Sequence, residues 1–281
     1  MVNDQGVFDD LVALRVTRFG AVSEVTLLGP GKGNAMGPDF WRELPLVFRA
    51  LDADPDVRAV TLTGSGQHFS YGLDLAAMLP RWAYVLEESG GSAEQRTAFL
   101  REIRALQAAF DAVSTCRKPV VAAVSGWCIG GGVDLIAAAD VRMASADARF
   151  SVREVRVGIV ADGGSLQRLP GIIGEGHIRE LAFTGKDIDA ARAERIGLVN
   201  DVYADRAAVL DAARELAAEI AANPPLVVQG VKEILNADRG LEIAAGLRYV
   251  SAWNAAFMPS HDLNEAVQAL RQRRTPTFLG T

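Results

Sequence analysis

The sequence predicts an α/β fold followed by a C-terminal helical region. Up to about residue 202, short segments rich in β-branched residues, typical of strands, alternate with amphipathic helical segments. After residue 202 the pattern is helical throughout. With 281 residues and 49% hydrophobic content, the chain can bury a large core in one or two domains. We therefore predict an α/β core over residues 1–202, which carries the functional site, and a separate helical region over residues 203–281.

The N-terminal elements are predicted from local patterns. Residues 11–19 and 21–28 are expected to form a hairpin of two strands joined at Gly20. The segment 120–124 is entirely apolar, which is typical of a strand buried on both faces. The remaining elements expected in this half are a strand over 57–63 and helices over 39–51, 75–86 and 94–113.

The second half is expected to begin with short elements and to end in long helices. Helical segments over 174–183 and 189–195 precede a strand over 198–202. Four further helices are predicted over 206–222, 225–235, 241–257 and 262–271.

Charge and composition narrow the function classes. The net charge is −6 with no long basic block, so we expect no nucleic acid and no anionic membrane as partner. The two cysteines and three histidines have no metal-ligand spacing, so no metal is expected. The termini show no targeting signal, and a cytoplasmic location is the simplest expectation.

The stretch from Gly126 to Gly164 holds the strongest functional signal. Three glycines, 130–132, precede an apolar run that is expected to be helical. Glycine lets a ligand approach the backbone closely, and a helix start offers unpaired N–H groups. The loop 64–74 also follows a strand and precedes a helix. The two loops are therefore expected to lie side by side and to form an oxyanion hole from backbone amides.

Three carboxylates in this stretch stand in apolar surroundings: Asp134, Glu154 and Asp162. Such groups are costly to bury unless they are paired, neutralised or used in chemistry. A structural interpretation stays open for each. Asp134 could cap a helix, Glu154 could pair with Arg153 or Arg156, and Asp162 could stabilise a glycine-rich turn. If used together beside an oxyanion hole, they suit proton abstraction next to a thioester or ketone carbonyl.

Several segments resemble the crotonase (enoyl-CoA hydratase/isomerase) superfamily over nearly the full length of the chain. They are Asn34-Ala35-Met36, His68-Phe69-Ser70-Tyr71-Gly72-Leu73-Asp74-Leu75, the segment 118–124, the triple glycine, and the segment 163–170. The resemblance implies a spiral of ββα units in the core, with region 203–281 building a homotrimer or a dimer of trimers. It also implies an acyl-CoA thioester as substrate, with no separate cofactor because coenzyme A is part of that substrate.

The resemblance also assigns roles to individual residues. It implies oxyanion donors at the N–H groups of Leu73 and Gly131. The substrate contacts that it suggests are Lys32, Asn34, Ala35, Tyr71, Gly72, Asp74, Leu75 and Gly130. Gly33 stands where many members carry a basic residue, so Lys32 is its candidate replacement as a phosphate contact.

The segment 128–136 is most similar to the Δ3,5-Δ2,4-dienoyl-CoA isomerase subgroup, whose acidic positions fall on Asp134, Glu154 and Asp162. This similarity implies a double-bond shift in the β-oxidation of fatty acids, in which Asp162 removes the C2 proton and Glu154 protonates C6. Asp134 would tune the other two. The alternatives are an enoyl-CoA hydratase, another crotonase-type isomerase, or an acyl-CoA-binding protein without catalysis.

Overall fold

The computed structural model describes residues 8, 10–29, 32–85, 92–258 and 260–277. Its centre is a six-stranded sheet in the order β1-β2-β3-β4-β6-β9, in which β1 and β2 are antiparallel and later neighbours are parallel. Its strands are β1 (Leu14–Phe19), β2 (Val22–Leu27), β3 (Ala59–Gly64), β4 (Val120–Val124), β6 (Val141–Ser145) and β9 (Asp201–Tyr203). The predicted hairpin is confirmed, with Gly20 in the left-handed conformation at its turn.

Strands β4 and β6 are each followed by a short strand in a second sheet and then by a helical turn. The second sheet has the order β5-β7-β8, formed by β5 (Trp127–Ile129), β7 (Arg149–Ser151) and β8 (Ile188–Asp189). β5 leads into α5 (Gly131–Ala137), and β7 leads into the 3-10 helix η2 (Glu154–Val157). A bridge between Ser70 and Cys128 adds the same step after β3. These stacked strand–strand–helix units agree with the predicted spiral.

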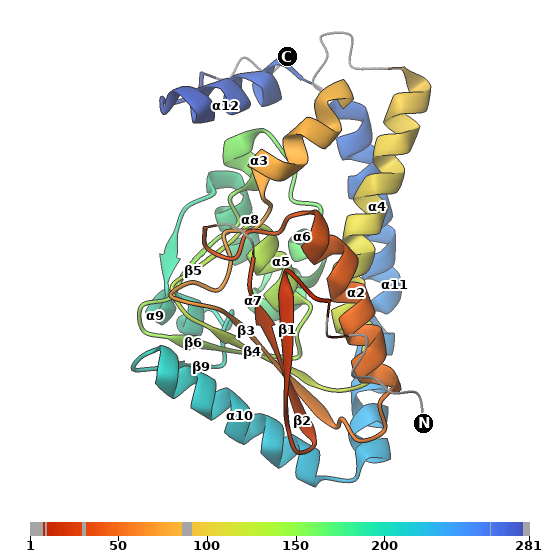
Figure 1. Ribbon diagram of the computed structural model, residues 1–281. Coiled ribbons are helices and arrows are strands. Elements are labelled where there is room, and N and C mark those ends of the chain that lie inside the picture. The colour runs from red at the N-terminus through yellow and green to blue at the C-terminus, as the bar shows by residue number, and fades with distance from the viewer. Residues whose placement is uncertain (1–7, 9, 30–31, 86–91, 259, 278–281) are drawn as a thin grey trace.

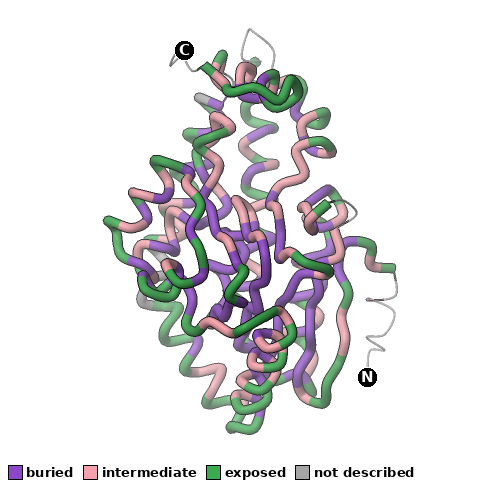
Figure 2. Tube along the Cα trace, turned by 90° about the vertical axis from the view of Figure 1, so that its left-hand side faces the viewer, coloured by how far each residue is buried: buried purple, intermediate pink, exposed green. Residues whose placement is uncertain are grey.

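Helices cover both faces of the main sheet. α10 (Arg206–Ala222) packs its alanine-rich face on β2, β3, β4 and β6, and it runs along one side of the sheet in Figure 1. The opposite face packs into the largest hydrophobic cluster, where α2 (Pro38–Ala53) contributes Phe40, Leu44 and Phe48. Strand β4 is therefore buried on both faces, as its apolar sequence predicts. Figure 2 shows the buried part of the trace concentrated in the interior of the molecule.

Two long helices lie side by side at one edge of the molecule (Figure 1). They are α4 (Ala93–Thr115) and α11 (Pro225–Phe257), and they run antiparallel. Asn236 of α11 donates to Ser114 O, while Gln107 of α4 donates to Leu247 O further along. Near the upper ends of both helices, the 3-10 helix η1 (Leu79–Val85) and α12 (His261–Gln272) close a smaller hydrophobic cluster.

The remaining helices are short. They are α3 (Leu75–Met78), α6 (Ser165–Arg168), α7 (Pro170–Ile173), α8 (Glu175–Thr184) and α9 (Ala190–Arg195). The predicted helix over 75–86 is therefore two pieces, α3 and η1, within its described part. The strand predicted over 198–202 begins later, as β9.

The prediction of separate helices over 225–235 and 241–257 is wrong, because α11 is continuous. Gly240 lies inside it, and a glycine costs a helix about 1 kcal/mol, far less than a proline. Packing of α11 along α4 outweighs that cost.

Candidate active site

Two loops meet at the edge of the main sheet where β3 and β4 end. Because these strands are parallel neighbours, the loops that follow them leave the sheet together. Ser70 N donates to Trp127 O at 3.0 Å, and Ile129 N donates to Ser70 O at 3.0 Å. The predicted juxtaposition of the two loops is confirmed.

The two loops also approach each other closely at Gly72. Its φ of 75° is in the left-handed region, and a Cβ on it would lie 2.6 Å from Ile129 O and 2.9 Å from Gly131 N. Only glycine allows this contact. It brings the amides of Leu73 and Gly131 close together: a Cβ on Gly131 would lie 3.7 Å from Leu73 N.

The amides of Leu73 and Gly131 are unpaired. In the part of the chain that the structure describes, neither N–H donates a hydrogen bond, and Gly131 is the first residue of α5. Leu73 and Gly131 both line a cavity that lies between these two loops and the elements α2, α4 and η1. Two unpaired amides at one edge of a cavity are suited to hold a developing oxyanion.

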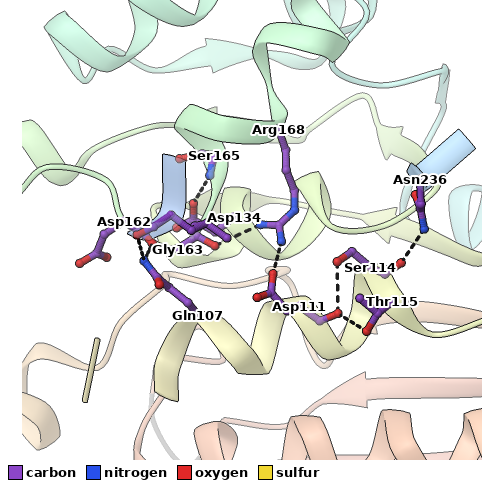
Figure 3. Close-up of polar contacts among 11 residues, drawn as sticks. Gln107, Asp111, Ser114, Thr115, Asp134, Asp162, Gly163, Ser165, Arg168 and Asn236 are labelled. Atoms are coloured by element: carbon purple, nitrogen blue, oxygen red, sulfur yellow. Dashed lines mark hydrogen bonds and ion pairs between the residues drawn. The ribbon is translucent and has the colours of Figure 1, made fainter. Parts of the chain in front are cut away.

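Asp134, Glu154 and Asp162 line the same cavity from three different elements. Asp134 is in the first turn of α5, Glu154 is the first residue of η2, and Asp162 precedes α6. A Cβ on Gly163 would lie 2.5 Å from Asp134 Oδ2, so the glycine lets Asp134 reach the backbone beside Asp162. Figure 3 shows Asp134, Asp162 and Gly163 gathered at this point.

The structure supports the structural interpretation of Asp134 and contradicts that of Glu154. Asp134 Oδ1 accepts from Ser165 N at 2.6 Å, so it does cap a helix, but that helix is α6 (Figure 3). Glu154 pairs with neither neighbouring arginine: Arg153 pairs with Asp187, and Arg156 donates to Thr184 O. Within the described residues, Glu154 Oε2 has no hydrogen-bond partner. It is therefore available to a ligand.

The two half-buried carboxyls have distinct proton affinities. Burial and the nearby charge of Asp134 raise the pKa of Glu154 to about 8. Burial also raises the pKa of Asp162, but a hydrogen bond from Asn254 opposes that shift and leaves it at about 6. Burial likewise raises the pKa of Asp134. Near pH 7 Glu154 therefore carries a proton while Asp162 is ionised.

The rest of the cavity is mostly apolar. α4 supplies four apolar side chains, Phe99, Ile103, Leu106 and Phe110, and tryptophans come from α2 and η1. Met258 follows the last residue of α11 and also lines the cavity. The C-terminal helical region thus forms part of the site, which the division at residue 202 does not anticipate.

The predicted substrate contacts divide into two groups. Tyr71, Leu75 and Gly130 line the cavity, and Tyr71 stacks on His68 with ring centroids 5.1 Å apart. The others do not line it: Lys32, Asn34, Ala35, Gly72 and Asp74.

Asn34 and Asp74 have structural partners instead. Asn34 Nδ2 donates to three carbonyls of the 64–74 loop, those of Ser65, His68 and Phe69, and Asp74 Oδ1 accepts from Ala77 N at the start of α3. Lys32 is exposed.

Sequence reasoning missed two amide side chains of the site. Gln107 lines the cavity, and Asn254 donates to Asp162 Oδ2 at 2.8 Å. Both belong to helices that read as ordinary amphipathic segments. An amide on the apolar face of such a helix is the signal that could have found them.

Comparison with known proteins places the chain in a family. The model of the enoyl-CoA hydratase/isomerase family matches residues 17–281. The chain belongs to this family. Solved structures agree: an enoyl-CoA hydratase/isomerase from Pseudoalteromonas atlantica superposes with a TM-score of 0.82 at 26% identity, covering 95% of this chain and 100% of that one. An enoyl-CoA hydratase/isomerase from Mycobacterium paratuberculosis superposes with a TM-score of 0.79 at 30% identity, covering 92% of this chain and 99% of that one. The core is therefore a crotonase-type spiral.

Curated relatives within the family carry a more specific name. A mitochondrial Δ3,5-Δ2,4-dienoyl-CoA isomerase from Dictyostelium discoideum is 43% identical, covering 92% of this chain and 87% of the relative. A peroxisomal protein of the same name from Arabidopsis thaliana is 40% identical, covering 96% and 97%. The human mitochondrial one is 42% identical, covering 95% and 82%.

The names of these relatives contradict the predicted cytoplasmic location, because they are mitochondrial or peroxisomal. The prediction is based on the absence of a recognisable targeting signal in the sequence, and the names of the relatives overturn it. Two further findings bear on the partners. No helix among the described residues is long and apolar enough to cross a membrane. In the same residues, no group of three or more His, Cys, Asp and Glu side chains could hold a metal.

Proposed function

We propose that this chain is a Δ3,5-Δ2,4-dienoyl-CoA isomerase that acts in the β-oxidation of unsaturated fatty acids. The observation that carries the proposal is the convergence of three carboxylates on a cavity that also holds two unpaired amides. The names of relatives at 40–43% identity support the same activity.

The proposed reaction moves one proton along the acyl chain. The amides of Leu73 and Gly131 hold the thioester oxygen while ionised Asp162 removes a proton from C2. The released electron pair forms the C2–C3 double bond, and the C3–C4 double bond shifts to C4–C5. The C5–C6 electrons then take a proton from Glu154 at C6. Burial and the nearby charge of Asp134 raise the pKa of Glu154, so the acid carries a proton when the substrate binds.

The reaction neither oxidises nor reduces the substrate, and the chain supplies the base, the acid and the oxyanion donors. We therefore propose that it needs no cofactor, since coenzyme A arrives with the substrate. The arrangement of Asp134 supports isomerisation over hydration. Hydration requires two carboxylates that grip one water, whereas Asp134 Oδ1 is bonded to Ser165 N.

The direct test is an assay with 3,5-dienoyl-CoA. We expect the conjugated 2,4-dienoyl thioester to form, as followed by its ultraviolet absorbance, with the same rate after dialysis against a chelator. The comparison substrate is a 2-enoyl-CoA, whose hydration removes the conjugated thioester absorbance. Faster hydration than isomerisation would favour the hydratase alternative. Binding of the acyl-CoA without turnover of either substrate would favour a non-catalytic protein.

We further propose that the chain assembles as a homotrimer or a dimer of trimers. The first half of α11 supports this, because it exposes a series of large apolar side chains that a lone chain would leave in water. They are Leu226 (82% exposed), Val227, Val231, Ile234 and Leu235.

Replacing Ile234 and Leu235 together by aspartate is expected to shift the chain toward monomer, because charges would face the apolar contact. Light scattering after size-exclusion chromatography measures the molar mass of the assembly. Leu46→Asp, at an exposed position of α2, is the matched control and should leave the mass unchanged. A wild-type monomer, or an unaltered mass in the double variant, would contradict the proposal.

A further inference from the structure

Asp162 is held from two helices that are distant from it in the sequence. Asn254 of α11 donates from Nδ2 to Asp162 Oδ2 and to Val160 O, both at 2.8 Å. Gln107 of α4 donates from Nε2 to Asp162 O at 2.9 Å (Figure 3) and to Leu247 O at 3.2 Å. The carboxylate and the backbone on both sides of it are thus fixed by side-chain amides.

Hydrogen bonds also hold these amide side chains in place. Ser251, one turn before Asn254 on α11, donates to Gln107 Oε1 at 3.2 Å. Asn254, Ser251 and Gln107 are 1%, 0% and 5% exposed, although each is polar. Burying three polar side chains is favourable only when their hydrogen bonds are made. Their bonds join α4, α11 and the loop of Asp162 into one unit.

We propose that Asn254 is a positioning residue that holds the Asp162 carboxylate in the orientation and ionised form that proton abstraction requires. Gln107 and Ser251 hold the surrounding backbone and helix. This inference rests on the proposed isomerase function and adds to it, because a side chain of the C-terminal helical region then holds the catalytic base.

The charges around Asp162 explain why a neutral donor suits this position. Asp134 on α5 and Glu154 on η2 line the same cavity, as does Arg153 just before η2, which pairs with Asp187. Arg168 on α6 donates to the carbonyl of neighbouring Gly163 at 3.3 Å. From α4 and α11 the groups bonded to Asp162 are amides. A lysine or arginine at 254 would neutralise the base and weaken it. The asparagine stabilises the ionised form while leaving its charge free to accept a proton.

The test is the pH dependence of kcat in Asn254→Ala. Asp162 must be ionised to act, so the rate falls as the pH drops through its pKa of about 6. Loss of the donor raises that pKa, and we expect the lower limb to move upward by about one pH unit, with kcat at pH 6 reduced about fivefold. Asn254→Asp preserves the shape but adds a second carboxyl, and it should move the limb further.

The chain offers a matched control. Asn236 lies on the same helix and donates to Ser114 O on α4 at 3.0 Å, but it is exposed and far along α11 from Asp162. Asn236→Ala should leave the pH profile of kcat unchanged.

A double-variant comparison separates positioning from general support of the fold. If Asn254 acts through Asp162, then Asn254→Ala made in the Asp162→Asn protein should change kcat by less than about twofold. A purely structural role would lower kcat by the same factor in both backgrounds and leave the lower limb in place. Either result would overturn the inference. An inactive wild-type protein would instead refute the proposed function itself.

Discussion

Asp162→Asn is expected to lower kcat on 3,5-dienoyl-CoA by about 10²- to 10⁴-fold, the usual loss when a general base is removed. The amide has nearly the same shape and can keep a polar contact with Asn254, but it cannot accept the C2 proton. The lower limb of the pH profile, which wild type should show near pH 6, should vanish with it. Steady-state rates between pH 5 and pH 9 measure both effects.

The control for this variant is Asp52→Asn. Asp52 pairs with Arg117 on the surface and does not line the cavity, so the same chemical change there should leave kcat within about twofold of wild type. If Asp162→Asn retained near-native isomerisation while remaining folded, Asp162 would not be the base. The remaining carboxylates would then have to account for proton abstraction.

The features of the site that the sequence predicts are those set by local chain geometry. The all-apolar segment 120–124 identifies a buried parallel strand, and the loops after β3 and β4 then have to meet at one sheet edge. The glycines at 72 and 130–132 permit the close contact that leaves two amides unpaired. Asp134, Glu154 and Asp162 stand out because charged groups are rare among apolar neighbours. Their convergence is confirmed, and their catalytic roles stay predictions.

Long-range partners could not be predicted in the same way. Asn254 and Gln107 reach Asp162 only because α11 packs antiparallel on α4, and no local pattern encodes that pairing. Asn34 is a related case. The family resemblance implied a ligand contact for it, whereas its side chain holds the loop that follows β3. In both cases the partner lies at least 31 residues away along the chain.

Glu154→Gln is expected to lower kcat by a similar factor, about 10²- to 10⁴-fold, for the opposite reason: glutamine cannot donate the proton to C6. The rate of wild type should fall above pH 8, where Glu154 loses its proton, and this upper limb should disappear in the variant. Together with the lower limb near pH 6, the wild-type profile is then a bell centred near pH 7. A wild-type rate that still rises above pH 9 would exclude Glu154 as the acid.

Glu154→Gln should also make the folded protein more stable than wild type at pH 7. The pKa of Glu154 is 4.5 in a free side chain and about 8 in the fold, so the folded state holds its proton more tightly. This tighter proton binding stabilises the folded state fully below pH 4.5, and the stabilisation is lost as the pH rises toward 8. At pH 7 the free energy of unfolding is therefore lower by on the order of 3 kcal/mol than it is below pH 4.5.

Glutamine removes that ionisation, so Tm at pH 7 should rise. Glu43→Gln provides the contrast, because that buried carboxylate accepts bonds from Ala13 N and Leu14 N and its loss should lower Tm. A gain in Tm that accompanies the loss of kcat would show that the fold carries Glu154 at a cost in stability, as expected for a group retained for its chemistry.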